Sequence, residues 1–343
     1  MINALSLPVA GALMLQPALP HIDSSQFANE SVQLSARVHG RIVSFTTRNP
    51  LDFAPMLRGE LGDESTLHAQ LFLPRGTDPH PAVIIVPGSG NIGPHHVEQA
   101  AALVAAGMAV LLIDPFHGRG IASTVEDQAR LTWAASTYDV IAALTYLRTL
   151  PQIDANRIGA LGSSRGGTAV MLAASEQISG RILTQGSGLK AIVAGYPWCG
   201  TQFRVARLAD DAALLVLAGD QDNWVSLHQC QDAVHALSQH NEKVSLRVFQ
   251  GASHAFDRSG VSPTRIENAP TATTFPTIYM DNKGDYIDPR TGRPDPALTP
   301  ADFLNWSIEG GFVRRGVTVG TRGEQAAEYR QAATDFLVAS LSP

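Results

Sequence analysis

Short, wholly apolar segments alternate along the middle of this chain with longer segments of helical period. Each apolar segment has the length of a strand that is buried on both faces. The predicted strands cover residues 82–86, 109–113, 158–161, 191–194, 213–217 and 244–249. The predicted helices cover residues 95–106, 125–150, 168–175 and 227–239. This alternation predicts an α/β fold with a mostly parallel twisted sheet and helices on both of its faces.

The N-terminal part of the chain has a different pattern. Residues 32–47 and 67–73 alternate between apolar and polar positions around a Gly-rich turn, which predicts an antiparallel start to the sheet. Residues 1–31 are interpreted as a leader or a signal segment, because residues 2–15 are apolar. However, no Lys or Arg precedes that run and Pro8 interrupts it. Residues 32–343 then form one domain.

Composition excludes some classes of function. The 343 residues are 44% hydrophobic and 16% charged, as in a globular protein with a large core. The net charge of −6 and the lack of a Lys/Arg-rich run give no electrostatic support for nucleic-acid binding. No apolar run reaches the length of a membrane span.

The sequence Gly-Ser-Ser-Arg-Gly at residues 162–166 lies between a predicted strand and a predicted helix. A serine at the apex of such a tight turn is exposed above the sheet, and this G-x-S-x-G pattern is the nucleophile elbow. The glycines are required because a side chain there would collide with the strand or the helix. Ser164 is therefore the predicted nucleophile, and it needs an adjacent base near neutral pH.

Functional residues of a parallel sheet collect at the carboxyl ends of its strands. His254 follows the last predicted strand in a Gly-rich loop and is the predicted general base. Asp220 and Asp222 lie in the turn after the preceding strand, where one would orient the imidazole and the other would close the turn. Asp257 is interpreted as a loop cap. The order serine, acid, histidine is that of the α/β-hydrolases.

With these motifs the chain resembles the α/β-hydrolase superfamily, and within it the dienelactone hydrolase-like family. The resemblance rests on the elbow, on Gly-Asp-Gln-Asp at 219–222, on Gly-Ala-Ser-His-Ala-Phe at 251–256 and on a closing helix at 326–337. It implies an α/β-hydrolase fold that hydrolyses esters, with Asp222 as the acid of the family's G-x-x-D pattern. The namesake enzymes of the family use a cysteine nucleophile where this chain has Ser164.

Acyl transfer also needs hydrogen-bond donors for the developing oxyanion. We expect the backbone N–H of Arg165 and that of Ser89 to serve, with Gly90 as the alternative to Ser89. The Gly88-Ser89-Gly90 segment resembles the His-Gly-x loop of the family, with Pro87 in place of the histidine. Further candidates for lining the site are Gly88, Gly90, His117 and Trp224, and His95 and His96 also fall in a predicted strand-end loop. No metal-ligand spacing is present, so we predict no metal and no cofactor.

The two cysteines bear on the compartment. Some dienelactone hydrolase-like proteins have a similar Tyr-Pro-x-Cys segment and a second cysteine after the acid turn, and the resemblance implies a disulfide between Cys199 and Cys230. Such a bridge would imply an oxidising, periplasmic or secreted location. Two free buried cysteines in a cytoplasmic enzyme remain the alternative.

Residues 258–322 form an insertion between the predicted base and the closing helix, and they are rich in Pro, Gly, Thr and Asp. We expect a partial lid, with surface decoration or a dimer contact as alternatives. Its expected aromatic anchors are Tyr279, Tyr286, Phe303, Trp306 and Phe312.

These patterns predict a serine hydrolase that cleaves small-molecule carboxylic esters or lactones through an acyl-enzyme. A serine peptidase of the acylaminoacyl or dipeptidyl type is the first alternative, although such enzymes usually carry a propeller domain upstream. A non-catalytic ligand-binding protein of the same fold is the second. The sequence does not fix the oligomeric state.

Overall fold

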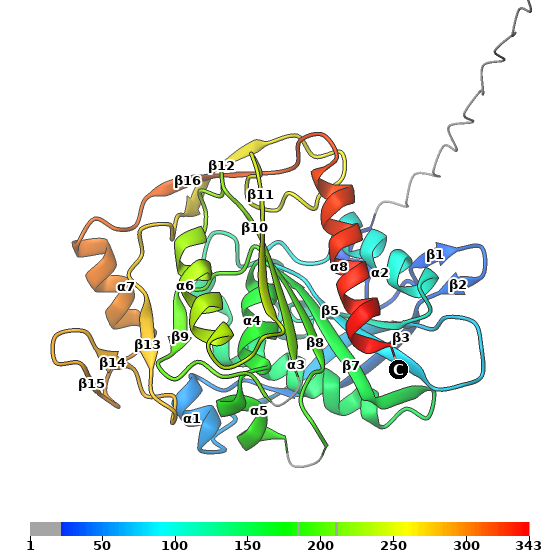
Figure 1. Ribbon diagram of the computed structural model, residues 1–343, viewed down its shortest axis with the longest axis horizontal. Coiled ribbons are helices and arrows are strands. Elements are labelled where there is room, and N and C mark those ends of the chain that lie inside the picture. The colour runs from blue at the N-terminus through cyan, green and yellow to red at the C-terminus, as the bar shows by residue number, and fades with distance from the viewer. Residues whose placement is uncertain (1–21, 184–185, 210–211, 343) are drawn as a thin grey trace, which may run out of the picture.

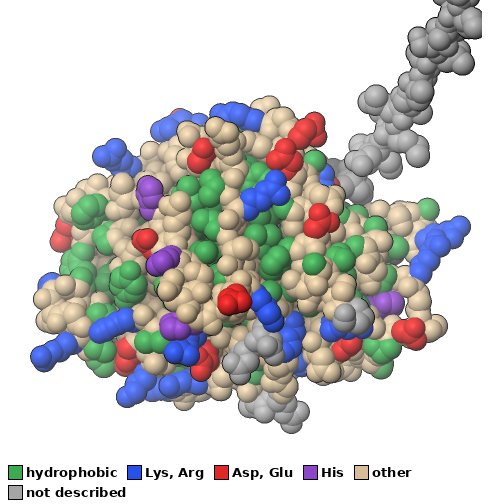
Figure 2. Space-filling model, viewed as in Figure 1, with side chains coloured by type: hydrophobic (Ala, Val, Ile, Leu, Met, Phe, Trp, Pro, Cys, Tyr) green, Lys and Arg blue, Asp and Glu red, His purple; other side chains and the backbone are tan. Residues whose placement is uncertain are grey.

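The computed structural model describes residues 22–183, 186–209 and 212–342. The apolar run at residues 2–15, interpreted as part of a signal segment, lies outside the described residues. Within them, no helix has both the length and the apolar character that crossing a bilayer would require. On the face shown in Figure 2, basic side chains lie interspersed with acidic ones.

An eight-stranded sheet runs through the described part of the chain (Figure 1). Its spatial order is β11 (Val244–Phe249), β10 (Ala213–Gly219), β8 (Ala191–Gly195), β7 (Ile153–Ser163), β5 (His80–Val86), β6 (Ala109–Asp114), β4 (Glu64–Phe72) and β3 (Arg41–Arg48). Strands β11 to β6 pair in parallel, whereas β4 is antiparallel to both β6 and β3. The predicted antiparallel start and parallel centre are therefore confirmed.

Helices cover both faces of the sheet (Figure 1). One face carries α3 (Trp133–Arg148), α4 (Arg165–Ala173) and α6 (Leu227–Ser238), and the other carries α2 (Pro94–Ala105) and α8 (Gln325–Leu341). The sheet has one apolar core on each side. In β6, Leu111 and Ile113 pack into the core under α3, α4 and α6, whereas Val110 and Leu112 pack into the core under α2 and α8. Successive side chains of a strand point to opposite faces. The whole arrangement is the α/β-hydrolase fold.

The helix predicted over residues 125–150 is wrong at its start, because α3 begins only at Trp133. Thr132 has extended backbone, and its side chain accepts the Ala135 N–H as an N-cap. Before it, the short 3-10 helix η3 (Gln128–Arg130) is capped by Asp127. Two side-chain caps thus interrupt a segment whose apolar period is continuous.

Shorter elements complete the domain. These are η1 (Ser24–Gln26), β1 (Gln33–Ser35), β2 (Val38–His39), α1 (Phe53–Leu57), η2 (His117–Arg119), α5 (Glu176–Ile182) and β9 (Thr201–Phe203). The segment around η1 packs on the core: Phe27 is 1% exposed, and Gln70 Nε2 donates to the carbonyl oxygens of Phe27 and Glu30. We therefore propose that the folded domain includes residues 22–31, which were expected to belong to the leader.

The insertion at 258–322 has its own secondary structure. It comprises β12 (Thr264–Pro270), β13 (Ile278–Met280), β14 (Ile287–Asp288), β15 (Arg293–Pro294), α7 (Pro300–Glu309) and β16 (Arg315–Val319). Strand β12 is antiparallel to β16, and β13 is parallel to β9. Tyr286 and Phe303 are buried, as expected of anchors, and Trp306 packs against the core. Tyr279 and Phe312 are each 42% exposed, so their prediction as anchors is wrong.

Candidate active site

Ser164 lies between the end of β7 and the first residue of α4. Its φ of 54° and ψ of −116° are strained for a residue with a side chain. Two backbone hydrogen bonds hold it there: Ser164 N–H donates to Gly195 O at 2.8 Å, and Thr168 N–H donates to Ser164 O at 3.0 Å. A Cβ on Gly162 would collide with the backbone oxygen of Gly166. The glycine spacing therefore has the steric reason given by the sequence pattern.

The structure brings Ser164, His254 and Asp222 into one chain of hydrogen bonds. Ser164 Oγ is 2.9 Å from His254 Nε2, and His254 Nδ1 is 2.7 Å from Asp222 Oδ2. The side chains of His254 and Asp222 are only 2% and 3% exposed. The hydroxyl is thus beside a base whose other nitrogen is oriented by a buried carboxylate, an arrangement that can activate the serine.

Two acidic residues of the turn after β10 have different surroundings. Asp222 Oδ1 accepts the N–H groups of Trp224 and Val225 at 2.8 and 3.0 Å, which fixes the carboxylate toward His254. Asp220 Oδ1 instead accepts the N–H of Gly251 at 2.7 Å, and so ties the two loops together. Only Asp222 contacts the imidazole.

Aromatic rings enclose the imidazole of His254. The rings of Trp224 and Tyr196 each have their centroid 4.8 Å from that of His254. Tyr196 OH donates to Asp257 Oδ1 at 2.7 Å, and Ser163 Oγ donates to Asp257 Oδ2 at 3.4 Å. Burial, with the nearby Asp257 carboxylate, raises the pKa of Tyr196 well above its usual range. The interpretation of Asp257 as a loop cap is therefore wrong, because its carboxylate lies in the core behind His254.

The predicted oxyanion loop lies against the elbow. A Cβ on Gly88 would be 3.0 Å from Ser163 O and 3.1 Å from Ser164 Cβ. Within the described part of the chain, neither the Ser89 N–H nor the Arg165 N–H donates a hydrogen bond to the protein. In that part of the chain, neither N–H is committed to another hydrogen bond, as an oxyanion donor requires. A Cβ on Gly90 would instead face the Arg258 guanidinium at 3.5 Å.

Three other histidines have surroundings of their own. His117 Nδ1 is 2.7 Å from Asp114 Oδ2, and Asn91 Nδ2 approaches the same nitrogen at 3.2 Å. His95 and His96 lie in the first turn of α2, not in a loop, and both are buried. Burial lowers the pKa of each imidazole well below its usual value. Among the described residues, no group of three or more His, Cys, Asp or Glu side chains could hold a metal ion.

The model of the dienelactone hydrolase family matches residues 67–274. The chain belongs to the dienelactone hydrolase family. It is accordingly a hydrolase of esters or lactones.

A Bradyrhizobium relative of this family member is named "Probable 2-oxo-3-(5-oxofuran-2-ylidene)propanoate lactonase", and it is 28% identical over 230 residues, 62% of this chain and 88% of the relative. Two solved structures share less of its sequence. A dienelactone hydrolase-like promiscuous phosphotriesterase from metagenomic libraries is 20% identical, with a TM-score of 0.43 over 64% of this chain and 86% of that one. A propionate-bound thermophilic esterase of Thermogutta terrifontis is 14% identical, with a TM-score of 0.44 over 57% of this chain and 82% of that one.

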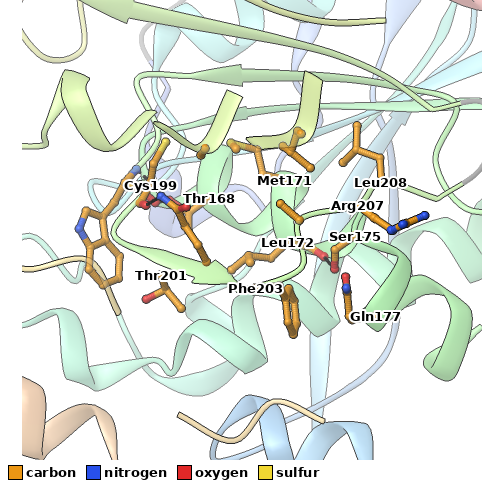
Figure 3. A pocket seen from close by; sticks show the side chains of 15 residues that line it. Thr168, Met171, Leu172, Ser175, Gln177, Cys199, Thr201, Phe203, Arg207 and Leu208 are labelled. Atoms are coloured by element: carbon orange, nitrogen blue, oxygen red, sulfur yellow. Dashed lines mark hydrogen bonds between the residues drawn. The ribbon is translucent and has the colours of Figure 1, made fainter. Parts of the chain in front are cut away.

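The disulfide expected from the family resemblance is confirmed: Cys199, after β8, is bonded to Cys230 of α6. It borders a cavity of about 60 Å³ that is lined mainly by apolar side chains of α4, β9 and α6, with Met171, Leu172 and Phe203 among them (Figure 3). None of Ser164, Asp222 and His254 lines this cavity. Thr168, whose N–H donates to Ser164 O, does line it, so in this dienelactone hydrolase family member the cavity shares one residue with the nucleophile elbow.

The environment of the Arg165 side chain was not predicted from the sequence. This guanidinium is buried, lies 4.1 Å over the ring of Trp133, and donates to Leu131 O, Ser136 Oγ and Gln128. Burial lowers its pKa to about 9. The only sequence signal was that a long polar side chain follows the nucleophile directly. Its partners lie in the segment that was predicted to be a regular helix.

Proposed function

We propose that this protein hydrolyses esters or lactones through an acyl-enzyme on Ser164, with His254 as the general base and Asp222 as the orienting acid. The observation that carries the proposal is the continuous chain of hydrogen bonds from Ser164 Oγ through the imidazole to the Asp222 carboxylate. In the described part of the chain, no other histidine forms a hydrogen bond with Ser164.

The geometry accounts for each chemical step. As Ser164 Oγ bonds to the carbonyl carbon, His254 Nε2 takes its proton, and the Asp222 carboxylate stabilises the imidazolium that forms. The carbonyl oxygen becomes an oxyanion, which the N–H groups of Ser89 and Arg165 would bind. One such donor is typically worth about 10²–10³ in kcat. The imidazolium then protonates the leaving alkoxide, and a water molecule activated by His254 releases the acid.

The substrate class follows from the family and its lactonase relative. A lactone and an open ester present the same carbonyl group, but ring opening of a lactone leaves the alkoxide attached to the acyl-enzyme. Hydrolysis of a lactone therefore yields a single hydroxy acid, whereas an open ester yields an acid and an alcohol. Similarity to the Bradyrhizobium lactonase supports small lactones as the first substrates to test.

Labelling with a fluorophosphonate, read by intact-protein mass, tests the assignment of the nucleophile. We expect one adduct on the wild type, none on Ser164→Ala, and one on Ser163→Ala, because the adjacent serine is buried toward Asp257. In parallel, p-nitrophenyl esters, small lactones and acyl-peptides are assayed with the same variants. An adduct that survives Ser164→Ala, or none on the folded wild type, would contradict the proposal.

We further propose that part of the insertion braces the acid and histidine loops. Asn223 Oδ1 accepts the N–H of Thr318 at 2.7 Å, and Gly320 N–H donates to His254 O at 2.9 Å. Replacing Asn223 by Ala should lower kcat for all esters to a similar degree. If the insertion were only a lid over the acyl group, changes in it would instead alter the preference for ester chain length.

We also propose that the protein is exported, because the disulfide is typical of oxidising compartments. Expression of the full sequence in a bacterial host, followed by fractionation and thiol alkylation without reductant, tests this. We expect the protein outside the cytoplasm with both cysteines unmodified by the reagent. Cytoplasmic protein with two alkylated cysteines would contradict it.

A further inference from the structure

We propose that Gln128 is a positioning residue for the oxyanion site, because its side-chain carbonyl oxygen joins the two residues whose N–H groups would bind the oxyanion. The inference rests on the proposed function. Gln128 belongs to neither the elbow nor the loop after β5, and it follows Ser89 by 39 positions and precedes Arg165 by 37.

The first connection is to the loop after β5. Ser89 Oγ donates to Gln128 Oε1 at 3.1 Å, and the Ser89 side chain is buried. The same segment also holds the backbone of Ser89, because Thr124 N–H and Ser123 Oγ donate to Ser89 O at 2.9 and 3.0 Å. Gln128 Nε2 donates to Thr124 O at 2.7 Å and so links these contacts. Ser89 is thereby held through its side chain and through its carbonyl oxygen, whose peptide plane carries the N–H of Gly90, the alternative donor.

The second connection is to the residue after the nucleophile. Arg165 Nη2 donates to Gln128 Oε1 at 2.9 Å and to Gln128 O at 2.6 Å, and Nε approaches Oε1 at 3.3 Å. The other acceptors of this guanidinium are Leu131 O and Ser136 Oγ. None of these acceptors is a carboxylate, so the buried cation depends on neutral oxygens, and Gln128 supplies two of them. The lowered pKa of Arg165 agrees with this environment.

A single amide oxygen therefore accepts hydrogen bonds from both sides of the oxyanion site. Preorganised donors are effective because they need no reorganisation when charge develops, and a misplacement of about 1 Å can cost about 10²-fold in rate. Loss of Gln128 Oε1 would leave Ser89 Oγ without this acceptor and would let the Arg165 side chain move. The two backbone donors would then lose their fixed spacing.

The test variant is Gln128→Met, which keeps the length of the side chain but removes both of its polar atoms. The matched control is Arg130→Met, at the exposed end of the same 3-10 helix. For Gln128→Met we expect kcat on a p-nitrophenyl ester to fall about 10- to 100-fold with KM changed less than about twofold. The inhibition constant of a trifluoromethyl ketone, whose hemiketal oxygen occupies the oxyanion site, should rise in parallel. The control should behave as the wild type.

Ser89→Ala provides a second route, because it removes only the hydroxyl and keeps the backbone N–H. We expect the same pattern, and the double variant with Gln128→Met should be no worse than the poorer single variant. Wild-type kcat in folded Gln128→Met, additive losses in the double variant, or a lost kcat without a weaker ketone would overturn the proposal. Failure of the proposed function is distinguishable, because it would abolish the fluorophosphonate adduct in the wild type itself.

Discussion

Replacement of Asp222 by Asn tests the acid assignment most sharply. The Asp222 carboxylate has distinct partners on its two oxygens: Oδ1 accepts two backbone N–H groups, and Oδ2 accepts the His254 Nδ1–H. An asparagine would keep its amide oxygen toward the two N–H donors, since the NH₂ group cannot accept them. The NH₂ group would then face Nδ1 and would require that nitrogen to be an acceptor.

The consequence is a change of tautomer in His254. With Nδ1 unprotonated, the proton lies on Nε2, which then cannot accept the proton of Ser164 Oγ at 2.9 Å. An imposed wrong tautomer in a serine triad costs about 10⁴ in kcat, which corresponds to about 5.4 kcal/mol of activation free energy. The fold should be little affected, because the amide retains the two backbone hydrogen bonds that carboxylate Oδ1 makes.

The assay is kcat and KM for a p-nitrophenyl ester, together with thermal unfolding followed by circular dichroism. Asp220→Asn is the matched control in the same turn, since its side-chain oxygen can still accept the Gly251 N–H. We expect the control to keep kcat within about twofold. The reasoning is refuted if Asp222→Asn keeps more than about a tenth of the wild-type kcat, or if the control loses as much.

Three further predictions concern stability. Arg119→Met should lower the free energy of unfolding, measured in urea, by about 3–5 kcal/mol, because the fully buried Asp139 carboxylate would lose its cation. A loss below about 1 kcal/mol would contradict this prediction. His96 has a lowered pKa in the folded state, so unfolding takes up a proton below pH of about 6.5 and stability falls as the pH falls. His96→Gln should therefore reduce the slope of the unfolding free energy against pH in this range by about 1.4 kcal/mol per pH unit. An unchanged slope would argue against a neutral imidazole in the folded protein. Reducing the Cys199–Cys230 disulfide, whose cysteines are 31 positions apart, should lower the free energy of unfolding by about 4 kcal/mol on the chain-entropy model. An unchanged melting temperature in dithiothreitol would contradict this prediction.

The sequence pattern of the insertion at 258–322 did not predict which of its aromatic side chains would be buried. Tyr286 is buried and its OH donates to Asp52 Oδ1 at 2.7 Å, across 234 positions of sequence. Burial raises the pKa of Asp52 despite that hydrogen bond. Tyr279 of β13 lies only seven positions before Tyr286 and is 42% exposed. Aromatic composition alone could not separate the two, because burial depends on which distant segment covers each ring.

Features that arise from local sterics and burial could be predicted from the amino-acid sequence. An all-apolar segment such as β6 can satisfy both of its faces only inside a sheet covered by helices, so the layers followed from periodicity. The glycines of the elbow marked Ser164 because no side chain fits at those positions. The loops after β10 and β11 indicated Asp222 and His254, since neighbouring parallel strands end at the same edge of the sheet.

Contacts between residues that are far apart in sequence could not be predicted, because they form only when the chain is packed. No residue near Gln128 in the sequence indicates that its amide oxygen accepts hydrogen bonds from both Ser89 and Arg165. These bonds depend on where α3 begins and on how the loop after β5 folds. Asp257 was mistaken for a cap for the same reason, since its partner Tyr196 lies on another strand end. Local propensity fixes the elements and the apex of the elbow. The supporting hydrogen bonds form only when packing brings separate loops to within about 3 Å of one another.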